Sequence, residues 1–297
     1  MSTLTQFDTS PDTGAAKLVN LQVSNWVTRV SAADNSWRGI AWNGTLFVAV
    51  SHNGASQVMT SPDGITWTSR SASTVNAWLS IAWNGTVFAA VSSSSTYLSA
   101  TANAVMTSPD GITWTTRTSA VDTAFSSIAW NGTVFAAVAN DGAGNRVMTS
   151  PTGTTWTGRS AAVANGWNAV AWNGTVFAAV ANSGTGNRVM TSPDGITWTS
   201  RTSAADNAWI AIAWNGTVFA ATATSGTGNR VMTSPDGITW TSRAAVNDQE
   251  WYGIAWNGLG TGTTLLLPTA GAGTVFAAVS QNTSGLRVMT SLFLKDE

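Results

Sequence analysis

Few residues of this chain could do chemistry, because the reactive residue types are scarce. His52 is the only histidine, there is no cysteine, and the two tyrosines are Tyr97 and Tyr252. A zinc site or a Ser/His/Asp triad would have to be built around that single histidine. Tyr252 and Glu250 form the only tyrosine–glutamate pair within a few residues. We interpret them as strand and loop residues, with a nucleophilic pair as the alternative. We therefore predict a non-enzymatic protein with no catalytic residue, no metal and no cofactor.

Binding chemistry is better supplied, by tryptophan and arginine residues that recur at regular spacing. A sugar needs a flat aromatic surface and a few polar groups around it. The candidate aromatic residues lie beside variable polar loops and are Trp37, Trp78, Trp167, Trp209 and Trp251, with Phe125 in the corresponding place of one repeat. The candidate arginines follow another variable loop and are Arg146, Arg188 and Arg230. We predict that these residues bind cell-surface carbohydrate. The alternative is that the tryptophans are buried between sheets and the arginines are solvated.

The same spacing divides the chain into six repeats. A second tryptophan column consists of Trp42, Trp83, Trp130, Trp172, Trp214 and Trp256, and its successive members are 41, 47, 42, 42 and 42 residues apart. A third column consists of Trp26, Trp67, Trp114, Trp156, Trp198 and Trp240. Periods of about 40 to 45 residues are typical of four-stranded propeller blades. Helical solenoids are excluded, because the repeats are rich in β-branched and aromatic residues and show no apolar period of 3.6 residues.

One repeat predicts one four-stranded antiparallel blade. The predicted strands are Trp209–Asn215, Thr217–Ala223, Arg230–Ser234 and Ile238–Arg243. Asn215-Gly216 predicts a tight hairpin turn, and Pro235-Asp236-Gly237 predicts an Asx-type turn in which the carboxylate accepts backbone N–H groups. Simple alternation places Trp209 and Ile212 on opposite faces, both of them apolar. A sheet that is apolar on both faces fits between two neighbours.

The ends of the chain predict how the ring closes. The third tryptophan column begins at Trp26, before any complete repeat, and the last repeat stops at Ser291 without a fourth strand. The strand at 23–29 should therefore complete the sixth blade, which removes exposed sheet edges. The small residues at Gly39 and its equivalents should mark the closest approach around the axis. The prediction is an all-β, six-bladed β-propeller, with residues 1–22 as a polar arm and 23–297 as one domain.

Composition and charge exclude several classes of partner. Only 9% of residues are charged, and the formal net charge is −1 with acids and bases interleaved. This gives no electrostatic basis for binding nucleic acid or an anionic membrane. The N-terminus lacks the basic and apolar regions of a signal peptide, and no stretch approaches 18 apolar residues. We predict no nucleic-acid partner, no membrane insertion and no signal peptide.

The turn sequence carries a resemblance to a known family. Met-Thr-Ser-Pro-Asp-Gly-Ile-Thr-Trp, which begins at Met59, Met106, Met190 and Met232, resembles the Asp-box of BNR, or sialidase-like, propeller repeats. Here the box is one residue shorter than the family pattern, the third repeat has Thr152 in place of the aspartate, and the sixth lacks the box. The resemblance implies the fold and says little about activity. The wider repeat also resembles those of phage tail-associated and other virion proteins and of bacterial surface proteins.

This resemblance and the irregular sixth repeat suggest a function. Residues 259–273 interrupt that repeat and contain Leu265, Leu266 and Leu267, and the tail contains Phe293. Such apolar segments suit a single protein partner. We predict a virion-associated propeller that displays glycan-binding loops and docks through these residues and the arm on another virion structural protein. The alternatives are a purely structural virion component and a free bacterial lectin at the cell surface or outside the cell. A glycosidase would need clustered acids in the central channel, where the repeat places small residues.

Overall fold

The computed structural model describes residues 4–8, 17–21, 29–93, 103–142, 145–245, 247–256, 274–280 and 288–293. Within these ranges the chain is all-β, with five four-stranded antiparallel sheets in sequence order. The first sheet comprises β3 (Trp37–Trp42), β4 (Phe47–Ser51), β5 (Val58–Ser61) and β6 (Thr68–Arg70), and the second β7 (Trp78–Trp83), β8 (Phe88–Ser92), β9 (Val105–Ser108) and β10 (Thr115–Arg117). The third comprises β11 (Phe125–Trp130), β12 (Phe135–Ala139), β13 (Val147–Ser150) and β14 (Thr157–Arg159), and the fourth β15 (Trp167–Trp172), β16 (Phe177–Ala181), β17 (Val189–Ser192) and β18 (Thr199–Arg201). The fifth comprises β19 (Trp209–Trp214), β20 (Phe219–Ala223), β21 (Val231–Ser234) and β22 (Thr241–Arg243).

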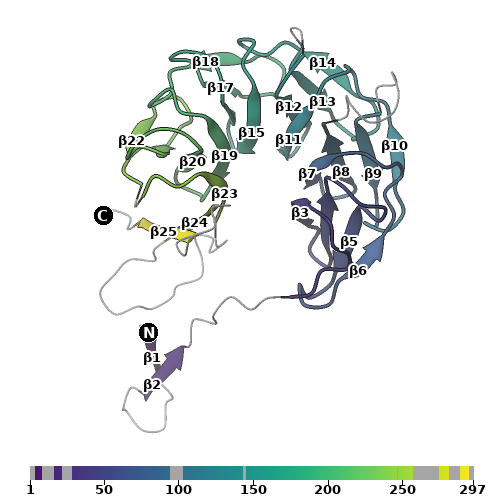
Figure 1. Cartoon of the computed structure of the whole chain (residues 1–297), viewed down its shortest axis with the longest axis horizontal. Coiled ribbons are helices and arrows are strands. Elements are labelled where there is room, and N and C mark those ends of the chain that lie inside the picture. Colours follow the sequence, from purple (N-terminus) through teal and green to yellow (C-terminus); the bar gives the residue numbers. More distant parts are fainter. Residues whose placement is uncertain are drawn as a thin grey trace.

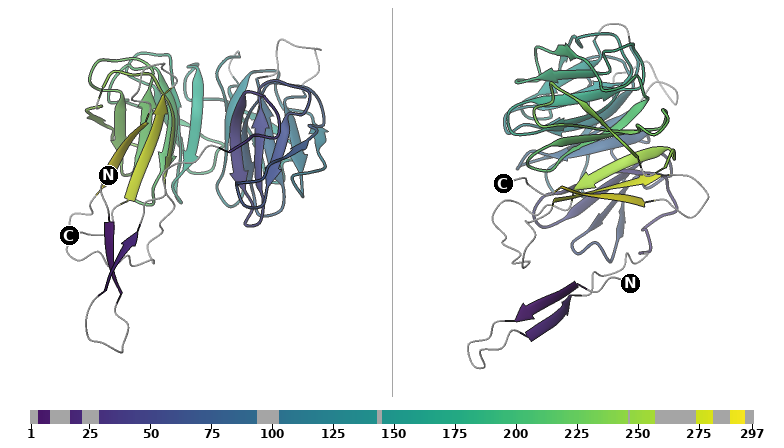
Figure 2. Two further views of the ribbon diagram at one scale, coloured as in Figure 1. Left: turned by 60° about the horizontal axis from the view of Figure 1, so that its bottom comes forward. Right: turned by 90° about the vertical axis from the view of Figure 1, so that its left-hand side faces the viewer.

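Three further strands, β23 (Trp251–Trp256), β24 (Thr274–Ser280) and β25 (Val288–Phe293), form a sixth sheet. The sheets are arranged in an arc around a common centre, with the first strand of each innermost and the fourth outermost (Figure 1). The first and sixth sheets lie at the two ends of this arc. A separate hairpin of β1 (Leu4–Asp8) and β2 (Lys17–Leu21) lies apart from the sheets (Figure 2).

The strand order within a repeat confirms the predicted blade, but its turns are longer than predicted. β19 ends at Trp214 and β20 begins at Phe219. The four residues between them form the turn, which is closed by a hydrogen bond from the backbone N–H of Asn215 to the carbonyl of Val218. The tight turn therefore centres on Gly216-Thr217, with Gly216 at a positive φ of 95°, and the Asn215 side chain accepts the N–H groups of Thr217 and Val218. The fourth strand likewise starts only at Thr241, because the preceding residues belong to the Asp turn.

The prediction that Trp209 and Ile212 face opposite ways is wrong, because a β-bulge follows Trp209. Trp209 pairs with Ala223 while Ala211 pairs with Thr222, so one residue of β19 has no counterpart on β20. A bulge shifts the alternation of side chains by one residue. Trp209, Ile212 and Trp214 consequently pack in the same apolar cluster. The same register shift occurs in the first strand of the other five sheets.

Apolar packing between neighbouring sheets forms the core. Between the first and second sheets, Val48, Val50 and Val58 pack against Trp78 and Phe88 of the next sheet. Equivalent clusters join the second to the third, the third to the fourth and the fourth to the fifth sheet. Trp78 and its counterparts Trp167 and Trp209 are completely buried. Each such tryptophan contributes on the order of 2 to 3 kcal/mol by removing apolar area from water.

The small residues on the first strands mark a close approach between sheets, as predicted. A Cβ added at Gly39 would lie 3.0 Å from both the carbonyl oxygen of Leu79 and the Cα of Ser80. Further along the arc, the Ser126 hydroxyl donates to the carbonyl of Trp167 in the next sheet at 2.6 Å. The inner strands are therefore joined by polar contacts as well as by packing.

Two predicted features lie outside the described residues: the insertion at 259–273 and the closing strand at 23–29, of which only Arg29 is described. The described part of the chain contains no helix long and apolar enough to cross a membrane.

The core predicts one stabilising substitution. Thr222 is completely buried and its hydroxyl has no hydrogen-bond partner among the described residues, whereas the corresponding residues Val50, Val91, Val138 and Val180 are buried valines. A buried hydroxyl without a partner costs about 1 to 3 kcal/mol. Thr222→Val should therefore raise the free energy of unfolding by about 1 kcal/mol or more in urea titrations. The matched change Val180→Thr should lower it, and a destabilised Thr222→Val variant would contradict the packing described.

Candidate functional site

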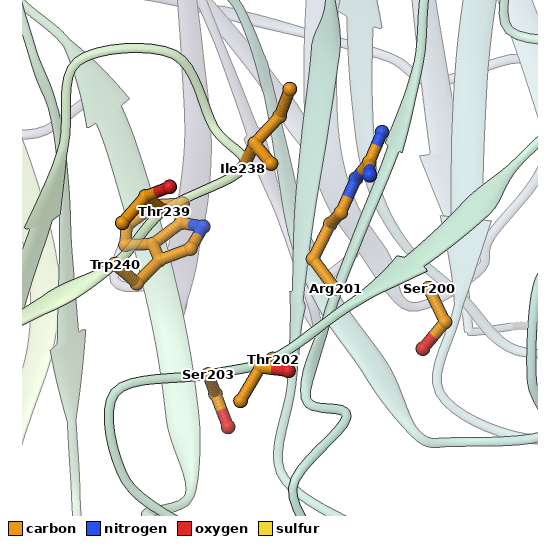
Figure 3. Close-up of a pocket in the computed structure, with 7 residues that line it drawn as sticks. All are labelled: Ser200, Arg201, Thr202, Ser203, Ile238, Thr239 and Trp240. Atoms are coloured by element: carbon orange, nitrogen blue, oxygen red, sulfur yellow. The ribbon is translucent and has the colours of Figure 1, made fainter.

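A cavity of about 480 Å³ lies at the outer edge of the junction between the fourth and fifth sheets. One side is formed by the end of β18 and the residues after it, and the other by the turn that precedes β22. Its lining residues are Ser200, Arg201, Thr202, Ser203, Ile238, Thr239 and Trp240. Figure 3 shows Trp240 and Arg201 on opposite sides, with Ile238 at one end and Thr202 and Ser203 at the other.

Arg201 is held in place by a single hydrogen bond. Its Nε donates to the hydroxyl of Thr191 on the adjacent strand at 2.9 Å. Its terminal amino groups have no hydrogen-bond or carboxylate partner among the residues that the structure describes. A guanidinium carries five N–H donors in a planar fork. Most of that donor capacity is therefore available to a ligand.

The Asp turn positions the opposite wall. The Asp236 carboxylate accepts the N–H groups of Ile238 and Thr239 at 2.8 and 3.0 Å, and the indole N–H of Trp240 donates to the carbonyl of Gly237 at 2.9 Å. Trp240 is largely buried, whereas Ile238 and Thr239 are exposed at the rim. The predicted Asx-type role of this aspartate is confirmed, because the carboxylate satisfies backbone donors.

These contacts set the charge state of the turn. Burial raises the pKa of the Asp236 carboxyl, but the hydrogen bonds from Thr239, Ile238 and Ser234 outweigh it, so the pKa lies below its ordinary value of 3.8. The same balance lowers the pKa values of Asp110 and Asp194. The carboxylate is thus ionised at neutral pH, and its lone pairs are directed at the backbone.

Polar groups complete the lining. Ser203 is 8% exposed, and its hydroxyl has no hydrogen-bond partner in the described residues. Ser200, Thr202 and Thr239 are exposed and carry further hydroxyls. The cavity therefore combines an indole, a guanidinium and several hydroxyl groups, with no carboxylate among its lining residues.

The framework of this cavity recurs at other junctions. The arginine that ends each fourth strand donates from Nε to a threonine hydroxyl of the third strand; these arginines are Arg70, Arg117, Arg159, Arg201 and Arg243. The tryptophan after each turn donates to a glycine carbonyl; these tryptophans are Trp67, Trp114, Trp156, Trp198 and Trp240. Four described junctions therefore bring such an arginine and such a tryptophan to adjacent sheets. The junctions differ at the position of Ser203, which elsewhere is Ala72, Ser119 or Ala161.

The first-column tryptophans do not form an exposed sugar-binding surface. Trp78, Trp167, Trp209 and Trp251 are completely buried. For these four tryptophans the prediction that they stack on a ligand is wrong, because the preceding sheet covers their rings. Trp37 is half-buried, at the end of the arc where no preceding sheet is described.

The predicted binding arginines clamp their own loops. Arg188 donates to the carbonyls of Gly184 and Asn182 at 2.8 and 2.9 Å and lies 3.6 Å from the Asp206 carboxylate. Arg230 makes the equivalent contacts with Gly226, Thr224 and Asp248, the last at 3.7 Å. These two arginines are thus engaged within the protein. Arg146 differs from them and is treated below.

The remaining candidates are not brought together. Leu265, Leu266 and Leu267 lie outside the described residues, and Phe293 ends β25. The Tyr252 hydroxyl donates to Glu250 at 2.7 Å, and this hydrogen bond, with burial and the negative charge, raises the pKa of the tyrosine. A nucleophilic tyrosine needs the opposite shift. No cluster of three His, Asp or Glu side chains suited to a metal occurs in the described ranges.

The sequence did contain a signal for the cavity. The fourth-strand arginines and third-column tryptophans are as regular as any residues in the chain, but regularity alone does not distinguish a binding role from a structural one. Their combination forms only where one repeat packs on the next, which one repeat considered alone does not reveal.

Comparison with known proteins identifies the fold. No family model matches the sequence, and a search of curated proteins finds no match. Among solved structures, virginiamycin B lyase from Staphylococcus aureus is 12% identical with a TM-score of 0.67, over 87% of this chain and 85% of that one. YCF48 bound to D1 peptide is 14% identical with a TM-score of 0.55, over 86% and 80% of the two chains. The β-propeller domain of Cps50 (Swd1) from Myceliophteria thermophila is 12% identical with a TM-score of 0.51, over 82% and 80%.

At these identities the likeness establishes the fold alone. Together with the repeated four-stranded sheets around a common centre, it defines the chain as a β-propeller protein, and the sheets are its blades.

The Asp turns predict an acid limit to stability. Asp63, Asp110, Asp194 and Asp236 have lowered pKa values in the folded protein. Their contribution to stability is therefore complete above about pH 4 and is lost as the pH falls through the folded-state values. The combined variant Asp63→Asn, Asp110→Asn, Asp194→Asn and Asp236→Asn keeps an acceptor oxygen at each site but cannot titrate. Its Tm should fall less between pH 5 and pH 2.5 than that of the wild type. Equal falls in the two proteins would show that the turns do not set the acid limit.

Proposed function

We propose that this chain is a non-enzymatic, closed six-bladed β-propeller that binds host-surface glycans at its blade junctions and is displayed on a virion. The observation that carries the proposal is the cavity in which the unpaired amino groups of Arg201 and the ring of Trp240 lie on opposite sides. Its volume falls in the usual range for small-ligand pockets, roughly 300 to 1,000 Å³. The exposed part of the largely buried Trp240 ring and the exposed Ile238 side chain offer apolar contact to a sugar, and the guanidinium and hydroxyl groups suit its hydroxyls.

The repeat makes the proposed binding multivalent. The arginine and tryptophan framework recurs at four described junctions. Weak binding at one junction would be amplified, by about 100-fold or more, where several junctions engage one surface together. The protein could therefore bind a surface tightly although each junction binds its glycan weakly. Such binding suits recognition of a glycan that is repeated on the surface.

The virion assignment rests on the resemblance of the repeats to those of virion proteins. In this proposal the arm 1–22, the segment 259–273 with its three leucines, and Phe293 dock on another virion structural protein. A purely structural component is the second candidate, and the complete burial of Trp78, Trp167 and Trp209 favours it. YCF48, a propeller of similar fold, binds the D1 peptide, so a peptide partner suits this candidate. A free bacterial lectin would use the same junctions without the docking.

Closure of the ring is supported by the uncovered face of the first blade. Ile40 is 58% exposed, whereas its equivalents Ile81 and Ile128 are 7% and 5% exposed, and Trp42 beside it is 42% exposed. Phe47 is only half-buried, while its counterparts on the second to fifth blades are completely buried. At every described junction this face is covered by the preceding blade. The sixth blade is the segment of this chain that would cover it.

The sixth blade has the matching positions. Val279 pairs with Val288 as Val50 pairs with Val58, so the register repeats the valine pattern that covers the second blade. In sequence, Arg287 and Asp34 also correspond to the pair Arg188 and Asp206. That pair would form only between the last repeat and the first.

Glycan binding is tested by titration over a glycan array, followed with intrinsic tryptophan fluorescence. The wild type should bind at least one glycan saturably. The combined variant Arg70→Gln, Arg117→Gln, Arg159→Gln and Arg201→Gln should lose that binding, because the free donors at all four junctions are removed. Arg38→Gln is the control, since it removes an exposed arginine that lines no junction cavity. Binding by no glycan, or undiminished binding by the combined variant, would contradict the proposal.

Closure is tested with an engineered disulfide, because the chain has no cysteine of its own. In the fifth blade Thr233 pairs with Thr241, and the equivalent residues of the sixth blade are Thr290 and Val27. Opposed residues of antiparallel strands have Cα atoms about 4.5 to 5.5 Å apart, within reach of a disulfide. Val27→Cys with Thr290→Cys should therefore cross-link on oxidation and change mobility on a non-reducing gel. Val23→Cys with Thr290→Cys is the out-of-register control; cross-linking of both pairs alike, or of neither, would argue against this closure.

A further inference from the structure

On the fourth and fifth blades, Arg188 and Arg230 each hold their own loop together with an aspartate from the next blade. Asp206, from the entry of the next blade, accepts the N–H of Gly186 at 2.6 Å and lies 3.6 Å from Nε of Arg188. Asp248 does the same with Gly228 and Arg230, at 2.6 and 3.7 Å. Each arginine is largely buried, with its side chain 16% or 14% exposed, whereas each aspartate side chain is 41% exposed. A largely buried guanidinium is thus matched by a carboxylate that solvent can reach.

The third blade has the arginine without the acid. Arg146 donates from one terminal nitrogen to the carbonyls of Asn140 and Asn165 at 3.1 and 2.8 Å. Its Nε is buried and has no partner in the described residues. The residue that corresponds to Asp206 is Ala164, which is exposed. On the next two blades the corresponding Nε–H donates to the carbonyl of Gly184 or Gly226, with the carboxylate nearby. The Nε–H of Arg146 has neither a hydrogen bond nor a carboxylate from the next blade beside it.

The first blade shows another way of holding this loop, whereas the second blade has Ala104 in place of the arginine, facing the acid Asp122. In the first blade the acid position is Val75, and the arginine position is Gln57. The Gln57 amide accepts the N–H of Asn76 and donates to its carbonyl, so the loop is clamped without a charge. When the acid is absent at that junction, the cation is absent too. Arg146 keeps its charge where the acid is missing.

We propose that Arg146 forms a binding site for the carboxylate of an external ligand, which takes the position that the Asp206 carboxylate occupies on the next blade. The small, exposed Ala164 leaves this position open to solvent. Carboxylates are the preferred partners of guanidinium groups, with short charge-assisted hydrogen bonds. The site is distinct from the cavity beside Arg201, since neither Arg146 nor Ala164 lines that cavity.

The test follows the Arg146 Nε–H resonance of the full chain by NMR, assigned from its loss in Arg146→Gln, during titration with sodium acetate. The resonance should shift and saturate in the wild type. Sodium chloride at equal ionic strength should not reproduce the shift. In Ala164→Asp the acetate response should be absent, because the new carboxylate fills the position from within the chain.

The matched control is Val75→Asp, which places the same charge at the corresponding position of a junction whose facing residue is Gln57. It should keep the wild-type response to acetate, as should Arg201→Gln, which removes the proposed glycan site. The proposal is overturned if acetate gives no saturable shift in the wild type, if chloride gives the same shift, or if Ala164→Asp responds as the wild type does. None of these outcomes depends on whether a glycan binds.

Discussion

Packing of large aromatic side chains from one blade against small and β-branched residues of the blade before it is the interaction on which the rest of this structure depends. Trp78, Phe88 and Met106 are completely buried, and the partners that cover them are residues such as Val48 and Val50. Each blade therefore has two apolar faces, and neither is satisfied until a neighbour is in place. The same interaction builds the arc and leaves an uncovered face at its first blade. It also brings two repeats together to form a junction cavity.

Polar groups are mostly committed to holding this packing in register. Four aspartates bind the backbone of their own turns, and Asp206 and Asp248 clamp loops of the preceding blade. With charged residues making up only 9% of the chain, few remain for a ligand. The exceptions are informative. The terminal nitrogens of Arg201 and the Nε of Arg146 are unpaired in the described residues, and they support the two binding proposals.

Much of the fold could be predicted from sequence, because each repeat encodes its own strands and turns. The blade order, the Asx role of Asp236 and the close approach at Gly39 were all predictable from local patterns. The side-chain faces of the first strand were not, because the bulge after Trp209 has no distinctive residue. The predicted stacking of a ligand on Trp78, Trp167, Trp209 and Trp251 is wrong for a related reason. A regular aromatic column fits a binding surface and a buried interface equally well, and only the packing of adjacent blades distinguishes them.

Native-state hydrogen exchange of β3, the first strand of the first blade, tests most directly the central proposal, that every apolar face is covered by a neighbouring blade around a closed ring. If the sixth blade covers the first, the amides of β3 should be protected to the same degree as those of its counterpart β7, because both strands would open only with the ring. Exchange of β3 that is faster than that of β7 by orders of magnitude would show that the face bearing Ile40 and Trp42 stays open, and would contradict the account.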